Sequence, residues 1–76
     1  MVIAAHHTRV AEALEAADDP AALRTYRMAL AHDADGLGAT RGLSRLARKS
    51  NDPELLAEAA EYEARVAAAE FAAAGF

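Results

Sequence analysis

Three arginines near the middle of the chain are the residues best suited to bind a ligand. Arg41, Arg45 and Arg48 lie in the segment 40–49 (TRGLSRLARK), which has four basic residues and no acidic one, although the chain's formal net charge is −4. On a helix, spacings of four and three place the three side chains on one face. Guanidinium groups bind carboxylates through forked hydrogen bonds, so we predict that this face binds a protein or an acidic peptide. The alternative is a solvated face, or pairing with the acidic residues of the last helix in the same or another chain.

The three histidines are the next candidates, and metal binding is the chemistry they would support. His6 and His7 are adjacent, so on a helix their side chains point about 100° apart and do not easily share one metal ion. His7 falls on an apolar stripe, which favours packing, and we also count it among the partner-binding candidates. His32 lies elsewhere in the chain. The prediction is therefore that the protein has no metal site and no cofactor.

Two further patterns, an acidic loop and the serines, do not indicate an enzyme. The acidic stretch from Asp33 to Gly36 resembles a calcium-binding loop, but Ser44 stands where the closing glutamate of such a loop belongs. No serine has a base that the sequence places beside it. We predict that the chain is not an enzyme. A small enzyme or a ligand-binding bundle that uses the histidines is the least favoured alternative.

Composition favours an all-α domain. The chain has 76 residues and no cysteine, 54% of its residues are hydrophobic and only 5% are aromatic. Much of the hydrophobic fraction is alanine, the best helix former, and the β-branched and aromatic residues typical of sheets are scarce. The acidic balance argues against nucleic-acid binding. No apolar run approaches the roughly 20 residues of a membrane span, so we predict no membrane partner and a cytoplasmic location.

Two Asp-Pro corners divide the chain into helices. Asp19-Pro20 and Asp52-Pro53 each combine a capping side chain with a proline that fits the first helical position. Gly36 is predicted to take the positive φ that ends a helix. The expected helices span residues 2–17, 20–32, 37–49 and 53–73. We predict one domain, 1–76, made of two antiparallel helical hairpins at 2–33 and 37–73, with a plain four-helix bundle as the alternative.

The spacing of these two corners resembles the period of a known family of helical repeats. They lie 33 positions apart (53 − 20), and a period of about 34 residues with two helices is the tetratricopeptide signature. Segment 22–35 (ALRTYRMALAHDAD) resembles the second helix and exit of such a repeat, with small Ala22 and Ala29, aromatic Tyr26 and then Leu30. The resemblance implies about two stacked repeats, whose first helices line a concave face that binds peptides.

The end of the chain is apolar and is predicted to self-associate. Val66, Phe71 and Phe76 have few neighbours that would bury them within one short bundle. A stack of only two repeats also exposes apolar ends. We therefore expect a homo-oligomer, or a part of a larger chain. The alternative is a frayed helix end.

Overall fold

The fold is all-α, as predicted. The computed structural model describes residues 3–74, with side chains from His6 onward, and within that range it contains four helices and no strand. The helices are α1 (Ile3–Ala16), α2 (Ala21–His32), α3 (Leu37–Ser50) and α4 (Pro53–Ala73). Their ends agree with the predicted ranges to within one residue, and the predicted start at residue 2 lies outside the described residues. In the described part of the chain, no helix combines the length and apolar character needed to cross a membrane.

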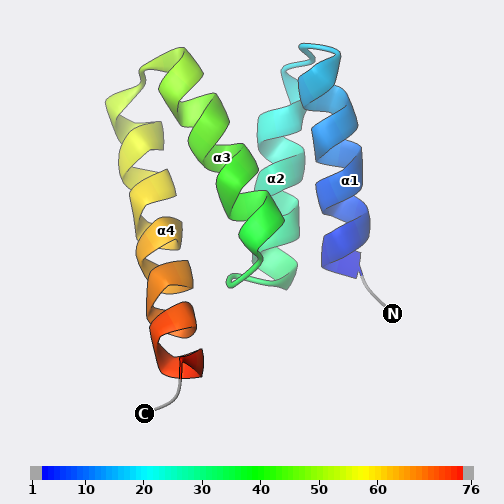
Figure 1. The fold of residues 1–76 in the computed structure, drawn as a ribbon. Coiled ribbons are helices and arrows are strands. Elements are labelled where there is room, and N and C mark those ends of the chain that lie inside the picture. The colour runs from blue at the N-terminus through cyan, green and yellow to red at the C-terminus, as the bar shows by residue number, and fades with distance from the viewer. Residues whose placement is uncertain (1–2, 75–76) are drawn as a thin grey trace.

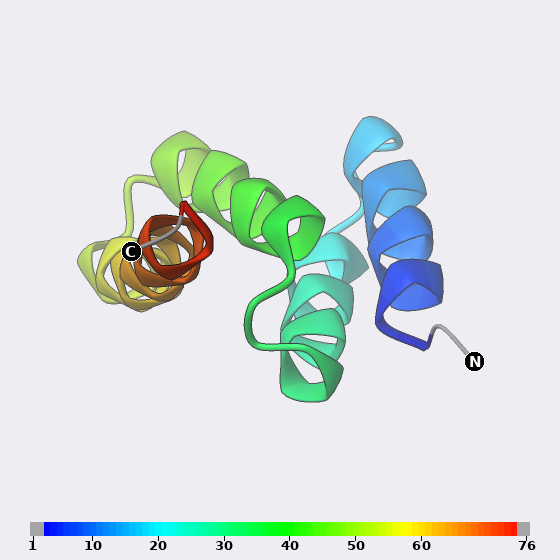
Figure 2. The same ribbon diagram turned by 60° about the horizontal axis from the view of Figure 1, so that its bottom comes forward.

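The helices form an open layer in chain order. Successive helices run in alternating directions, and α4 lies at the opposite end of the layer from α1 (Figures 1 and 2). Each helix packs on the next, α1 also touches α3, and α1 and α4 do not approach within residues 3–74. The described chain measures 42 × 33 × 17 Å. A closed four-helix bundle, the alternative prediction, would bring the first and last helices together, so the described residues do not form one.

Alanines and three large side chains build the core. Tyr26, Leu30 and Leu43 are the largest fully buried side chains. Alanines from all four helices fill the space around them and let the backbones come close: Ala11, Ala22, Ala29, Ala39, Ala47 and Ala59. The spacing of the side chains on α2 predicts that Ala22, Leu23, Tyr26, Ala29 and Leu30 face inward, and all five are buried or half-buried. On α1 the same reasoning predicts an inward stripe through His7, Val10 and Leu14. Leu14 packs against the core, but the prediction is wrong at Val10, which is 40% exposed whereas its neighbour Ala11 is fully buried.

The two Asp-Pro corners are similar, although α4 begins at its proline and α2 begins one residue after its own, at Ala21. The carboxylate of Asp19 accepts a hydrogen bond from the Ala21 N–H, and that of Asp52 accepts one from the Glu54 N–H, both at 2.9 Å. The capping role predicted for both aspartates is confirmed. Just before each corner, one non-glycine residue adopts positive φ, Asp18 at 58° and Asn51 at 55°.

The connection between α2 and α3 differs from the prediction. Gly36 has φ of −66° and ψ of 112° and directly precedes α3, so the positive φ predicted for it is wrong. No side chain caps α3. The Asp33 carboxylate instead accepts a hydrogen bond from the Asp35 N–H at 3.1 Å, which turns the chain locally.

We expect Asp19→Ala and Asp52→Ala each to lower the free energy of unfolding by about 1 kcal/mol, because each leaves a helix N-terminal N–H without its acceptor. Urea denaturation followed by circular dichroism measures the change. Asp35→Ala is the matched control, since it removes an exposed carboxylate that makes no described capping bond. A loss in the control as large as in the cap variants would contradict the assignment.

Candidate functional site

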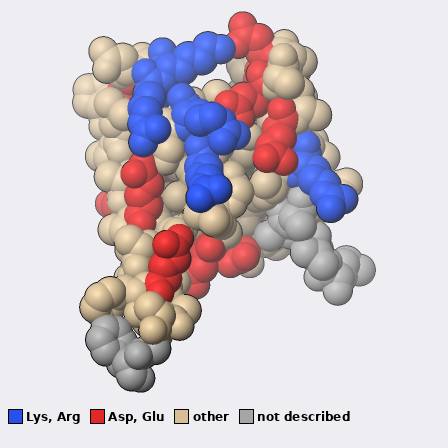
Figure 3. Space-filling view, viewed as in Figure 1, with Lys and Arg blue, Asp and Glu red and all other residues tan. Residues whose placement is uncertain are grey.

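An open groove between α3 and α4 is the candidate site. Figure 1 shows the two helices meeting at their shared turn and diverging away from it. The space between them has a volume of about 380 Å³. It is lined from α3 by Leu37, Thr40, Arg41, Ser44, Arg45 and Arg48, and from α4 by Glu63, Val66, Ala67 and Glu70. All three predicted arginines therefore reach one groove, and Figure 3 shows basic side chains gathered on this face with acidic ones on either side.

Two of the arginines are unengaged. Arg41 and Arg48 are exposed and make no hydrogen bond or ion pair with any residue that the structure describes. They lie seven residues apart on α3, hence on nearly the same side of the helix and two turns from each other. Each can therefore receive an anionic group without giving up an existing contact.

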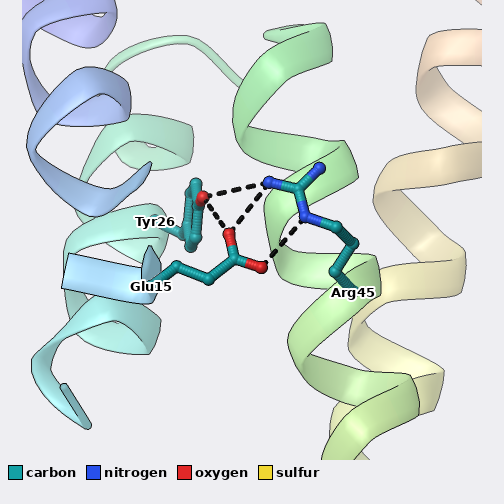
Figure 4. A network of polar contacts seen from close by, with 3 residues as sticks. All are labelled: Glu15, Tyr26 and Arg45. Carbon is teal, nitrogen blue, oxygen red and sulfur yellow. Dashed lines mark hydrogen bonds and ion pairs between the residues drawn. The ribbon is translucent and has the colours of Figure 1, made fainter. Parts of the chain in front are cut away.

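Arg45 has a different role from the one predicted. Its Nε donates to Oε2 of Glu15 and its Nη2 to Oε1, both at 2.9 Å (Figure 4). The Tyr26 hydroxyl donates to the same Oε1 at 2.6 Å and accepts from Arg45 Nη2 at 3.2 Å. Arg45, predicted to bind a partner, is thus already paired with Glu15 in the structure. Its guanidinium is held by a glutamate of α1, whereas the alternative prediction placed the pairing on the last helix.

The network also fixes the protonation of its members. The hydrogen bond from Arg45 lowers the pKa of Glu15, with a smaller contribution from the Tyr26 hydroxyl. Burial, followed by the hydrogen bond to Glu15, raises the pKa of Tyr26 to about 12. Because the Glu15 side chain is only 22% exposed, this pair is screened less than an ordinary surface pair. At neutral pH Glu15 is thus ionised and Tyr26 is a hydroxyl donor.

The floor of the groove is partly apolar and partly polar. Val66 is 8% exposed, and Ser44 donates from its hydroxyl to Glu63 Oε1 at 2.7 Å. Thr40 is 2% exposed, and its hydroxyl oxygen has no hydrogen-bond partner among the described residues. The α3 side of the groove therefore holds one buried polar group that nothing in the described chain satisfies.

The self-association residues do not form one exposed surface. Val66 is buried between α3 and α4, so its predicted place on an exposed self-association surface is wrong. Phe71 is 67% exposed, as that role requires. Phe76 lies outside the described residues. Self-association through the end of α4 stays a prediction that rests on Phe71.

His7 lies away from the groove. Its ring stacks on that of His32 with centroids 5.2 Å apart and an interplanar angle of 7°. The residue is half-buried, and its Nδ1 has no described hydrogen-bond partner. The structure does not bring His7 together with the arginines, and the packing interpretation fits its position. Within the described residues, no three potential ligands gather that could hold a metal ion.

Several residues of the site were missed from the sequence. Ser44 and Glu63 meet because α3 and α4 run antiparallel from the corner at residues 51–53. Counting outward from that corner would have paired Ser44 with a residue one helical turn earlier on α4. His7 and His32 stack because α1 and α2 run antiparallel from their shared turn, which places residues at similar distances from the turn beside each other. Glu15 carries no such signal, because its contact with Arg45 joins helices that are not consecutive in the chain.

Comparisons with known proteins add no identity. The chain matches no protein-family model, no curated protein and no solved structure. Membership of the tetratricopeptide family thus stays a prediction from sequence.

The raised pKa of Tyr26 gives a test of the network. In a Tyr62→Phe variant, which leaves Tyr26 as the single tyrosine, we expect the ultraviolet absorbance of tyrosinate to appear with a midpoint at about pH 12. The unfolded state has the ordinary pKa of about 10 and loses its proton first. The stability that this hydroxyl contributes is therefore complete below pH 10 and is lost as the pH rises toward 12. A midpoint at the ordinary value in the folded protein would contradict the network.

Proposed function

We propose that this chain is a non-enzymatic protein-interaction module that binds an acidic segment of a protein or peptide in the groove between α3 and α4. One observation carries the proposal. Arg41 and Arg48 stand on one wall of that groove, beside a floor that is partly apolar, and neither is paired with any described residue. Concave sites with an apolar lining and a few well-placed polar groups are the usual form of binding pockets.

The contrast with Arg45 supports this assignment. An acidic ligand at Arg45 would have to compete with two charge-assisted hydrogen bonds to Glu15. At Arg41 and Arg48 it competes only with water. Because guanidinium groups are more weakly hydrated than ammonium groups and bind carboxylates in a forked geometry, two free arginines favour a carboxylate-bearing ligand.

The proposed site differs in part from the predicted one. The prediction placed the partner on the first helices of the two hairpins, which would include His7 on α1. The groove favours a site between α3 and α4 instead, since every residue that lines it comes from these two helices. The tetratricopeptide resemblance supports an interaction module over an enzyme. A homo-oligomer, or a place within a larger chain, remains compatible with this site, and sedimentation equilibrium would measure the former.

We expect a fluorescein-labelled peptide of alternating Glu and Leu to bind the wild-type protein, as measured by fluorescence anisotropy. The double variant Arg41→Ala, Arg48→Ala should weaken binding at least about tenfold, because each lost pair with a charged group is worth about 1.5–3 kcal/mol. Both side chains are exposed and unpaired, so the variant should unfold at the same urea concentration as the wild type.

The matched control is Arg9→Ala, Arg24→Ala. It removes the same charge from exposed arginines on α1 and α2 that do not line the groove. Affinity in this control should remain within about twofold of wild type, apart from the small long-range effect of net charge. Equal losses in the two double variants, or no binding of the acidic peptide, would contradict the proposal.

A further inference from the structure

We infer that the ligand of the α3–α4 groove is an amphipathic helix with two acidic residues seven positions apart and apolar residues three and four positions after the first. This inference rests on the proposed function and names the kind of segment that the groove selects. Three features of the groove carry it: the spacing of its free arginines, the state of Arg45 and the acidic residues of the opposite wall.

The spacing of the free arginines selects a helical ligand. Arg41 and Arg48 are seven residues apart on α3, which separates their backbone positions by about 10 Å along the helix axis. Acidic residues seven apart on a ligand helix have the same separation and share a face. On an extended strand, side chains of one face recur at about 7 or 13 Å, so neither spacing matches. A helix lying along α3 therefore places both of its acids in register.

The middle of the groove excludes a third acid. Arg45 lies between the two free arginines, and its charge is already matched by Glu15 at 2.9 Å. Val66 and Ala67 of α4 line the groove nearer to its Arg41 end, because they lie beyond Glu63, which bonds Ser44. Apolar ligand residues between the two acids, on the side of the acid that pairs with Arg41, would cover them. This is the pattern of a helix that lays an apolar stripe into a groove.

The opposite wall fixes how the ligand helix is rotated. Glu63 and Glu70 line the groove from α4. The carboxylate of Glu63 accepts the Ser44 hydroxyl, whereas that of Glu70 has no hydrogen bond or ion pair with a described side chain. An acidic residue facing this wall would be repelled, and a basic one would be favoured. The acidic edge of the ligand helix must therefore face α3. Binding then depends on where the acidic residues lie on the ligand, and not only on the ligand's net charge.

Thr40 adds a buried hydroxyl without a described partner at this end of the groove. It precedes Arg41 on α3, lines the groove and is 2% exposed, and its hydroxyl has no described partner. A buried hydroxyl without a hydrogen bond lowers stability. Because the oxygen itself is buried, a ligand acceptor beside Arg41 would bond this hydroxyl only after the surrounding side chains move.

Peptide isomers of one composition test the spacing. Three alanine-based helical peptides would each carry two Glu, one Leu and one Val, with the Glu residues three, four or seven positions apart. Isothermal titration calorimetry on the full chain should show the seven-spaced peptide binding at least about tenfold more tightly than either isomer, the loss expected when one ionic anchor is out of reach. A seven-spaced peptide with a central proline, which cannot form the helix, should lose a similar factor.

Variants of the protein identify which residues produce the preference for acidic residues seven positions apart. Arg48→Ala should bring the three isomers to within about threefold of one another, whereas Arg24→Ala should leave the preference intact. Glu70→Gln should raise the affinity of a fourth peptide that carries an extra Glu on the edge facing α4. Circular dichroism of each variant confirms that the fold is unchanged.

The outcomes separate this inference from the proposed function. Equal affinity of all three isomers for the wild-type protein, with loss in the Arg41→Ala, Arg48→Ala variant, would overturn the helical spacing and leave an unspecific acidic-peptide site. Undiminished binding of the proline peptide would overturn the helical conformation. Failure of every acidic peptide to bind would contradict the proposed function and this inference with it.

Discussion

The contact of Tyr26 with Gly42 is the constraint on which the rest of the structure depends. The ring of Tyr26 is fully buried and lies against the backbone of α3 at Gly42. A Cβ atom at position 42 would lie 2.1 Å from Cζ of this ring, so no side chain larger than hydrogen fits. The Tyr26 hydroxyl reaches the edge of the core, where Glu15 and Arg45 satisfy it. One aromatic side chain thus joins α1, α2 and α3.

This junction also divides the basic face of α3 into two kinds of arginine. Arg45 lies beside the Tyr26 hydroxyl and is bonded to Glu15, so it stabilises the packing of α3 on α1 and α2 (Figure 4). Arg41 and Arg48 lie before and after it, beyond the reach of Glu15, and remain open to the groove. The network fixes the rotation of α3 about its axis, and the proposed ligand site follows from that rotation.

Much of the fold could be predicted from local signals. The helix ends follow from Asp-Pro corners whose capping acts within three residues, and the inward face of α2 follows from the spacing of its large side chains. The face of α1 was mispredicted because hydrophobicity favours Val10, whereas close packing against α2 favours the smaller Ala11. For Gly36, the sequence indicated a break, but the backbone conformation there depends on the turn formed by Asp33.

The site was less predictable because it depends on contacts between distant parts of the chain. Three arginines on one face were visible from spacing alone, but their division into engaged and free residues was not. Arg45 is separated from Glu15 by 30 positions, and only the placement of α3 against α1 and α2 brings them together. Likewise, the packing of the Tyr26 ring on Gly42 joins α2 to α3 and has no signal within either segment.

The most direct test of this account is the free energy of unfolding of Gly42→Ala compared with Gly38→Ala. In a helix interior, replacing glycine with alanine ordinarily stabilises by up to about 1 kcal/mol. Gly38→Ala should change the free energy of unfolding by less than about 1 kcal/mol, since Gly38 lies in the first turn of α3 and its Cβ would meet only the Thr8 side chain, at 3.2 Å. Gly42→Ala should instead destabilise by about 1–3 kcal/mol or more, because it overpacks the buried Tyr26 ring. A Gly42→Ala protein as stable as Gly38→Ala would contradict the account.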